Sequence, residues 1–117
     1  MLFRSNTALG YLTLNSNTTG VSNISIGSRA LQVNTTGAFN IAIGASALVN
    51  NTGNDNYFNV ALGNAALYSN VSGGNNTAVG IYALHANTGG FSMAAVGYYA
   101  LAANTNGNDS GHGEQRL

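Results

Sequence analysis

The chain repeats one short motif six times, and this repeat constrains the fold more than any other feature. A glycine that follows an apolar residue marks each copy, and successive marks are 17, 17, 19, 17 and 17 residues apart. A period this short cannot hold a pair of packed helices and lies below the usual leucine-rich or ankyrin lengths. It is about the length of one coil of a β-solenoid, in which equivalent residues stack at roughly 4.8 Å spacing. The marker glycines are Gly10, Gly27, Gly44, Gly63, Gly80 and Gly97.

The six copies cover almost all of the 117 residues. We predict an all-β fold, a repetitive β-solenoid of about six 17-residue coils over residues 6–109. Residues 1–5 would form a lead-in and residues 110–117 a polar C-terminal tail. The third coil carries two extra residues around 53–58, which we interpret as a bulged corner, with a binding loop as the alternative. The coils are predicted to start at Asn6, Asn23, Asn40, Asn59, Asn76 and Met93.

The first residues of each coil alternate in size, as the residues of a strand do. Counted from the coil start, position two is mostly β-branched, position four is always apolar, and position three is always alanine or serine. We expect the large side chains inside the coil, as a core column at position four. We expect the small ones to point outward as an oligomer interface, because a strip of methyl groups lets another sheet approach closely. The core column is Leu9, Ile26, Ile43, Leu62, Val79 and Val96, and the interface column is Ala8, Ser25, Ala42, Ala61, Ala78 and Ala95.

The segment after each marker glycine is predicted less sharply. It fits either a second short strand or one helical turn, because alanine and leucine favour both weakly. The Asn-Thr-Thr-Gly motif that follows, as at 17–20, is typical of turns. Its asparagines, stacked from coil to coil, would form an amide ladder. The marker glycines are expected to adopt a backbone conformation forbidden to other residues, or to lie where another segment passes close by. A leucine recurs in every copy as the expected second wall of the core: Leu14, Leu31, Leu48, Leu67, Leu84 and Leu101.

Composition excludes several classes of protein. Charged residues make up 5% of the chain and the net charge is zero, which speaks against a nucleic-acid surface. There is no cysteine, so neither a disulfide framework nor a thiolate metal site is available. No run of apolar residues approaches the roughly 20 needed for membrane insertion, and the first residues lack the apolar core of a signal peptide.

No catalytic residue, metal site or cofactor is predicted. The two histidines, His85 and His112, have no neighbours at metal-ligand spacing and are interpreted as surface residues. The carboxylates Asp55, Asp109 and Glu114 are far apart in the sequence. We therefore expect that the protein is not an enzyme.

Aromatic residues gather in the last three coils, at variable positions after the glycine and after the leucine. Stacked coils would bring them together on one side of the solenoid. Such a row serves either as a contact surface for carbohydrate or protein, or as packing across an interface, and both alternatives remain open. The candidate ligand contacts are Tyr68, Tyr82, His85, Tyr98 and Tyr99.

The motif Asn-Thr-Ala-Val-Gly at 76–80, with Ala83-Leu84 and Asn87-Thr88 after it, resembles the head repeats of the YadA-like trimeric adhesins. It is even more similar to the Asn-Thr-Ala-Ile-Gly repeats of phage-type and bacterial tail-fibre proteins. The resemblance covers residues 6–109, although the YadA-like repeat is shorter than the coil here. It implies a left-handed parallel β-roll, three chains around one axis, and an extracellular place on a cell surface or virion fibre.

The function expected from these observations is a non-enzymatic structural segment of an extracellular homotrimeric fibre or adhesin. Its partners would be copies of itself and a host-surface glycan or protein. One alternative is a self-assembling filament whose subunits stack end to end, because a solenoid without a polar cap exposes two sheet edges. A further alternative is an ice-binding protein, since threonines such as Thr18, Thr35 and Thr88 align from coil to coil on a low-charge solenoid.

Overall fold

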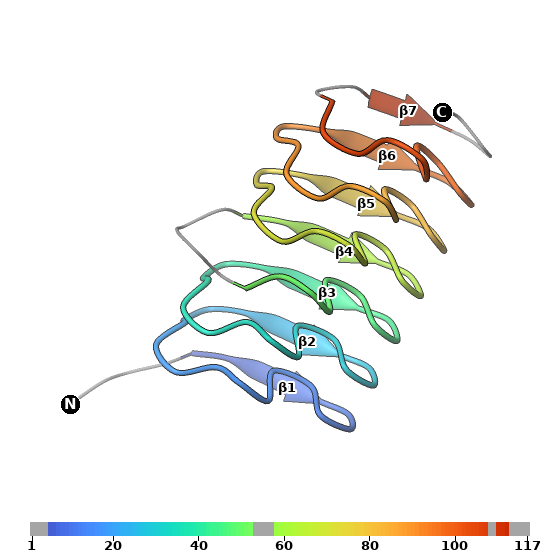
Figure 1. The fold of residues 1–117 in the computed structure, drawn as a ribbon. Coiled ribbons are helices and arrows are strands. Elements are labelled where there is room, and N and C mark those ends of the chain that lie inside the picture. The colour runs from blue at the N-terminus through green and yellow to red at the C-terminus, as the bar shows by residue number, and fades with distance from the viewer. Residues whose placement is uncertain (1–4, 53–57, 108–109, 113–117) are drawn as a thin grey trace.

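The computed structural model describes residues 5–52, 58–107 and 110–112, and it is an all-β solenoid, as the repeat predicts. Seven three-residue strands form one parallel sheet in chain order (Figure 1). β7 continues the sheet into the stretch expected to be a polar tail, so the tail prediction was wrong for these three residues. The strands are β1 (Thr7–Leu9), β2 (Ile24–Ile26), β3 (Ile41–Ile43), β4 (Val60–Leu62), β5 (Thr77–Val79), β6 (Ala94–Val96) and β7 (Ser110–His112).

The repeat sets the register of the sheet. Each strand residue lies beside its equivalent in the next coil, so Ala42 pairs with Ser25 on one side and Ala61 on the other. The two extra residues between β3 and β4 leave this register unchanged. The predicted bulged corner lies at 53–58, and its residues 53–57 are outside the described part of the chain. In the described residues, no helix has the length and apolar character needed to cross a membrane.

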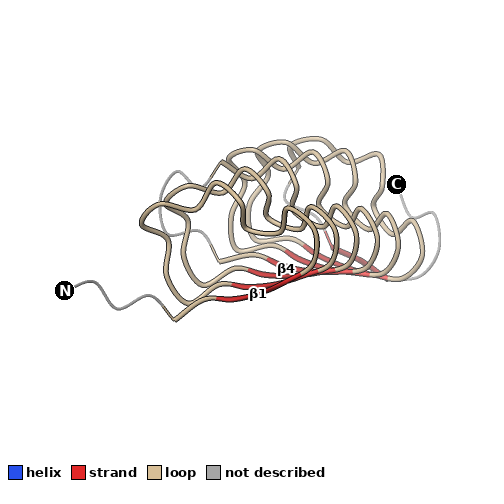
Figure 2. Cartoon of the chain, turned by 90° about the horizontal axis from the view of Figure 1, so that it is seen from below, coloured by secondary structure: helices blue, strands red, loops and turns tan. Residues whose placement is uncertain are grey.

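The half of each coil after the glycine is neither a strand nor a helical turn, in contrast to both alternatives above. It is a ribbon of overlapping turns, which we call the turn ribbon, and it forms part of the tan trace in Figure 2. The turn ribbon consists of residues 11–16, 28–33, 45–50, 64–69, 81–86 and 98–103. In the second coil the amides of Ala30 and Gln32 donate to the carbonyls of Gly27 and Arg29. The third residues of these two turns, Arg29 and Leu31, have φ of 63° and 48°, the geometry of type II turns.

Stacking of coils stabilises this unusual backbone. An L-residue in the left-handed region costs roughly 1–2 kcal/mol, and each coil has two such residues in its ribbon. Their amides donate to neighbouring coils: Leu31 N lies 3.1 Å from Ala47 O, and Arg29 N lies 2.8 Å from Tyr11 O. A single coil would have neither bond, so the ribbon depends on its neighbours. The paired positions are Leu12 and Leu14, Arg29 and Leu31, Ser46 and Leu48, Ala65 and Leu67, Tyr82 and Leu84, and Tyr99 and Leu101.

The strands face the opposite way from our prediction. Position three points into the coil: Ala42 and Ala61 are 0% exposed, and the buried Ser25 hydroxyl donates to Ala30 O at 2.8 Å. Position four points outward, and Leu9 and Ile43 are 67% and 39% exposed. Ala8 belongs to the inward column by register, but it lies in the first coil and is exposed. The core-column prediction was therefore wrong for Leu9, Ile26, Ile43, Leu62, Val79 and Val96. The prediction of an outward interface column was wrong for Ser25, Ala42, Ala61, Ala78 and Ala95, which are buried, whereas Ala8 is exposed.

The narrow section of the coil explains this reversal. The molecule measures 45 × 24 × 16 Å, and its interior lies between the sheet and the turn ribbon. The ribbon fills that interior with one leucine per coil, so the facing strand residue must be small; adding methylenes to a packed core costs roughly 1–3 kcal/mol. The leucine wall is confirmed, with Leu14 partly buried at the first coil. The fully buried members are Leu31, Leu48, Leu67, Leu84 and Leu101.

Candidate functional site

The outward side of the sheet is an exposed, mostly apolar surface, and we call it the outer sheet face. Alternation along each strand points positions two and four to this one side. Among its members Ile24, Ile43 and Val96 are 37%, 39% and 40% exposed. Six strands at roughly 4.8 Å, each three residues wide, give a footprint of roughly 300 Å². The face consists of Thr7, Ile24, Ile41, Val60, Thr77 and Ala94 with Leu9, Ile26, Ile43, Leu62, Val79 and Val96.

The outer sheet face contains no charged residue, and threonine is its only polar residue type. An exposed apolar patch of a few hundred Å² is as large as the largest patch on many monomers and often marks an interaction site. The column of small residues that we expected on the outside points into the coil, so the outward side carries two columns of mostly larger aliphatic side chains instead.

Two asparagine ladders hold the coils in register behind this face. The predicted ladder is confirmed: Asn34 Nδ2 donates to Asn17 Oδ1 at 3.2 Å, and Asn87 Nδ2 donates to Asn70 Oδ1 at 2.9 Å. Its side chains are buried from the second coil to the fifth, so hydrogen bonds between the amides replace the hydrogen bonds to water that burial removes. Rigid stacking of this kind fixes the spacing of every surface column.

A second ladder, which we did not predict, lies at position one. Here the side-chain oxygen accepts the backbone amide of the next coil, as from Asn40 N to Asn23 Oδ1 at 2.9 Å. The side-chain nitrogen donates to a corner carbonyl, as from Asn23 Nδ2 to Gly37 O at 2.8 Å. Within the described residues, Asn40 Nδ2 is the one buried side-chain nitrogen without a partner, and its coil is the one with the two extra residues. Asparagine at the start of five coils was the signal for this ladder.

Both expectations for the marker glycines are confirmed. Gly63 has φ of 135°, a conformation that L-residues rarely adopt. A Cβ placed on Gly63 would lie 2.6 Å from the carbonyl carbon and oxygen of Gly80 in the next coil. The marker position therefore admits no side chain.

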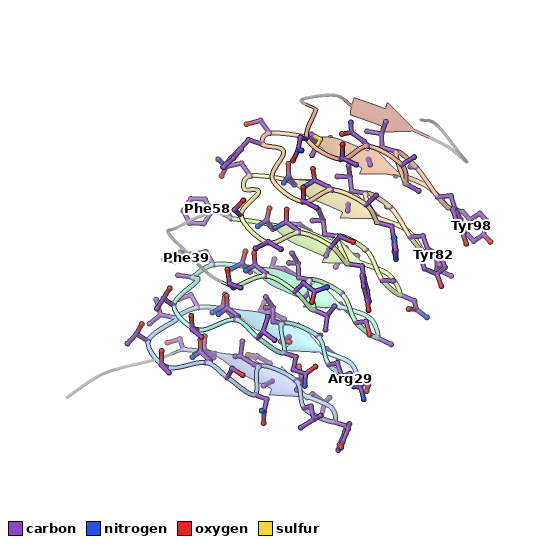
Figure 3. The ribbon with its side chains drawn as sticks, in the orientation of Figure 1. Arg29, Phe39, Phe58, Tyr82 and Tyr98 are labelled. Atoms are coloured by element: carbon purple, nitrogen blue, oxygen red, sulfur yellow. The ribbon has the colours of Figure 1, made fainter. Side chains whose placement is uncertain are left out.

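The predicted aromatic residues do come together, as one continuous group that we call the aromatic row. Tyr68 stacks on His85 with ring centroids 5.0 Å apart and an interplanar angle of 12°. Tyr82 contacts His85 at 5.0 Å and Tyr99 at 4.8 Å, and Tyr98 contacts Tyr99 at 4.5 Å. Figure 3 shows Tyr82 and Tyr98 on the edge opposite Phe39 and Phe58. The stacking is thus confirmed, whereas ligand contact stays a prediction.

Two members of the aromatic row have shifted pKa values. Partial burial lowers the pKa of His85 from its usual 6.5, which favours the neutral imidazole. Partial burial, and then the neighbouring Tyr98, raise the pKa of Tyr99 above its usual 10. Arg29 is the one charged residue in the described part of the chain, and it lies in the second coil, away from the row.

A second aromatic contact, which the sequence analysis did not predict, lies on the opposite edge. Phe39 and Phe58 pack edge to face with ring centroids 5.3 Å apart. Both rings remain about half exposed. Each precedes a position-one asparagine, so the coil alignment places them next to one another.

The threonine column at the turn is engaged in the fold. Thr18 Oγ1 donates to Thr35 O at 3.1 Å, and Thr35 Oγ1 donates to Thr52 O at 2.9 Å. Hydroxyls bonded to the next coil are less available to an external lattice. The geometry therefore gives the ice-binding alternative no added support.

Residues for metal or acid–base chemistry are sparse. Throughout the described ranges, no three His, Cys, Asp or Glu side chains come together in a way that could hold a metal ion. The outer sheet face and the aromatic row are thus the two candidate contact surfaces of the described residues. Comparison with known proteins found no matching family model, curated protein or solved structure.

Proposed function

We propose that this chain is a non-enzymatic structural segment of an extracellular homotrimeric fibre, in which three copies pack through their outer sheet faces. The observation that supports this most is the exposed aliphatic surface along β1 to β6, with Ile24, Ile43 and Val96 all more than a third exposed. The resemblance to adhesin head and tail-fibre repeats supports the extracellular setting and the number of chains.

Packing of identical copies suits the geometry of this face. Each coil carries the same two outward positions, so three parallel chains in register would bring equivalent coils to one level around the axis. Closed symmetric assemblies of this kind are the usual form of homo-oligomers. Burying roughly 300 Å² of apolar surface would contribute about 7 kcal/mol per chain, from which the cost of association is subtracted.

The test is the mass of the assembly in solution for the wild type and for Ile43→Asp. Ile43 is 39% exposed, so aspartate there should leave the solenoid folded and break the trimer, because three carboxylates would meet in an apolar contact. We expect light scattering to give three chains for the wild type and one for the variant at micromolar concentration.

The matched control is Ile81→Asp. Ile81 is 44% exposed but lies on the turn ribbon, outside the outer sheet face. This variant should remain trimeric. A monomeric or dimeric wild type would contradict the proposal, as would equal effects of the two substitutions. Long fibres in electron micrographs with no three-chain species would favour the end-to-end filament.

A further inference from the structure

We propose that the aromatic row formed by Tyr68, Tyr82, His85, Tyr98 and Tyr99 is a binding site for a neutral oligosaccharide. This goes beyond the structural role above and does not depend on the number of chains. The row lies on the turn ribbon, along one edge of the solenoid, where Figure 3 labels Tyr82 and Tyr98.

The fold itself does not require rings at these positions. In the third coil the counterparts of Tyr98, Tyr82 and His85 are Ala45, Ser46 and Val49. That coil has the same turn ribbon and the same buried alanine and leucine. The outermost rings also keep much of their surface in solvent, with Tyr98 50% and Tyr68 38% exposed. Their presence in coils four to six is therefore better explained by a contact than by packing within the coil.

The rings are fixed in place before any ligand arrives. The amides of Tyr82 and Tyr99 donate to Asn64 O at 3.0 Å and Ile81 O at 2.9 Å, which ties their backbone to the preceding coil. Each ring then contacts the next at centroid distances of 4.5–5.0 Å. A rigid aromatic surface loses little conformational entropy on binding, which increases affinity.

The chemistry of the row points to a neutral polyhydroxylated ligand. Ring faces and edges offer apolar contact, and four phenol hydroxyls can donate and accept hydrogen bonds. Sugar rings match both features, with C–H faces beside hydroxyls. Anionic polymers need cationic partners, and the nearest described cation, Arg29, belongs to a distant coil.

The length of the row suits a short sugar chain. Three coils at roughly 4.8 Å extend about 10 Å between the outer coils. Five partly exposed rings over this length form a short contact surface. A short oligosaccharide lying along the edge matches this length.

The experiment uses an array of neutral gluco-, manno- and galacto-oligosaccharides, with sulfated glycans as the anionic comparison. Titration with the strongest binder then compares variants. We expect binding to neutral oligosaccharides, weakened about tenfold in Tyr98→Ala and in Tyr68→Ala, and less in Tyr98→Phe, which keeps the ring. The matched control is Tyr11→Ala, since Tyr11 occupies the same coil position as Tyr98 in the first coil and is 68% exposed; its affinity should be unchanged.

The proposal is overturned if no neutral oligosaccharide binds, if only sulfated glycans bind, or if Tyr11→Ala weakens binding as much as Tyr98→Ala. Circular dichroism of each variant confirms that the solenoid is intact. Light scattering on the same samples separates this inference from the fibre proposal. A monomer that binds sugar would refute the trimer and support the proposed binding site. A trimer that binds no sugar would support the trimer and refute the binding site.

Discussion

The two halves of each coil fill the same interior in opposite ways. The turn ribbon contributes a large residue, such as Leu67, and the strand contributes a small one, such as Ala61; both are 0% exposed. On the outside, the two halves differ in how much their residues vary. The strand presents aliphatic residues in every coil, whereas the ribbon's outward positions vary from Tyr11 to Arg29 to Asn64. The comparison teaches that side-chain size at a buried position is set by the segment across the interior.

The outer surfaces of the two halves also differ in what they imply. A solvent-facing position without a role tolerates many residue types, and the outer positions of the ribbon in the first three coils show that variety. Position four of the strand is Leu, Ile or Val in every coil although it is exposed or half-buried. In the proposed trimer, this outward aliphatic column would form the contact between chains.

The largest expected effect is from Ala61→Arg, which places a charge between the two halves. Ala61 has no exposed surface and no acidic neighbour inside the coil, so we expect loss of the fold, more than about 5 kcal/mol. Circular dichroism and urea unfolding would measure it. The adjacent substitution Leu62→Arg faces outward and should fold while weakening association. A folded Ala61→Arg protein with altered oligomeric state would reverse our assignment of the two sides.

The next effect is expected at the glycine that joins the two halves. Gly63→Ala brings a methyl group against Gly80 at 2.6 Å and requires a φ of 135°, so it should cost more than about 3 kcal/mol in free energy of unfolding. Gly89→Ala is the control, because its nearest atoms are side-chain oxygens of Ser72 and Asn106 at 3.2 and 3.3 Å. Equal melting temperatures for the two variants would show that the coil spacing is not rigid.

A pair of leucines in one coil compares the two halves directly. Leu67→Ala creates a cavity in the ribbon wall and should cost about 3 kcal/mol, independent of protein concentration. Leu62→Ala removes an outward side chain, so its cost should be smaller and should depend on concentration, because assembly is linked to folding. Denaturant unfolding at two concentrations measures both. A larger loss in free energy of unfolding for Leu62→Ala, independent of concentration, would show that Leu62 packs inside the coil.

The smallest expected effect is the pH dependence of stability that comes from His85, on the outer surface of the ribbon. Burial lowers its folded-state pKa below 6.5, so the unfolded chain takes up the proton first as the pH falls. The contribution of His85 to the free energy of unfolding is therefore fully present well above pH 6.5. It is lost as the pH falls through 6.5 toward the folded-state pKa. Thermal melts of the wild type and His85→Gln should diverge slightly in this window. Parallel curves would show that the imidazole is fully solvated.

A better use of the internal repeat would have predicted the orientation of the strand. Positions one, three and five share one side of the strand and are nearly constant: asparagine, alanine and glycine, as in Asn76, Ala78 and Gly80. Stacked identical side chains and close backbone contacts demand such constancy. Positions two and four vary among Thr, Ile, Val, Leu and Ala. In the strand, positions whose residue is the same in nearly every coil point inward. We used the hydrophobicity of the residues instead, and in this strand the more hydrophobic positions point outward.

The aromatic row was predictable as a group and not as an arrangement. Coil alignment brings Tyr82 and Tyr99 to the same position, and they do contact each other. The stacking of Tyr68 on His85 combines two coils at one position, which the alignment also allows. The contact between Tyr98 and Tyr99 depends on how two adjacent side chains leave the turn. Spacing in the sequence carries no information on that direction.

The sequence by itself determined the period, the parallel register, the leucine wall, the amide ladder and the special glycines, because stacking forces equivalent residues into the same environment. Only the tertiary structure decided which side of the strand faces inward and that the second half of the coil is a ribbon of turns with residues in the left-handed region. Both depend on the distance between the sheet and the ribbon, which allows one leucine per coil opposite a small strand residue. That distance results from packing and hydrogen bonds between coils, such as Leu67 N to Ala83 O at 3.0 Å, and no single repeat contains it.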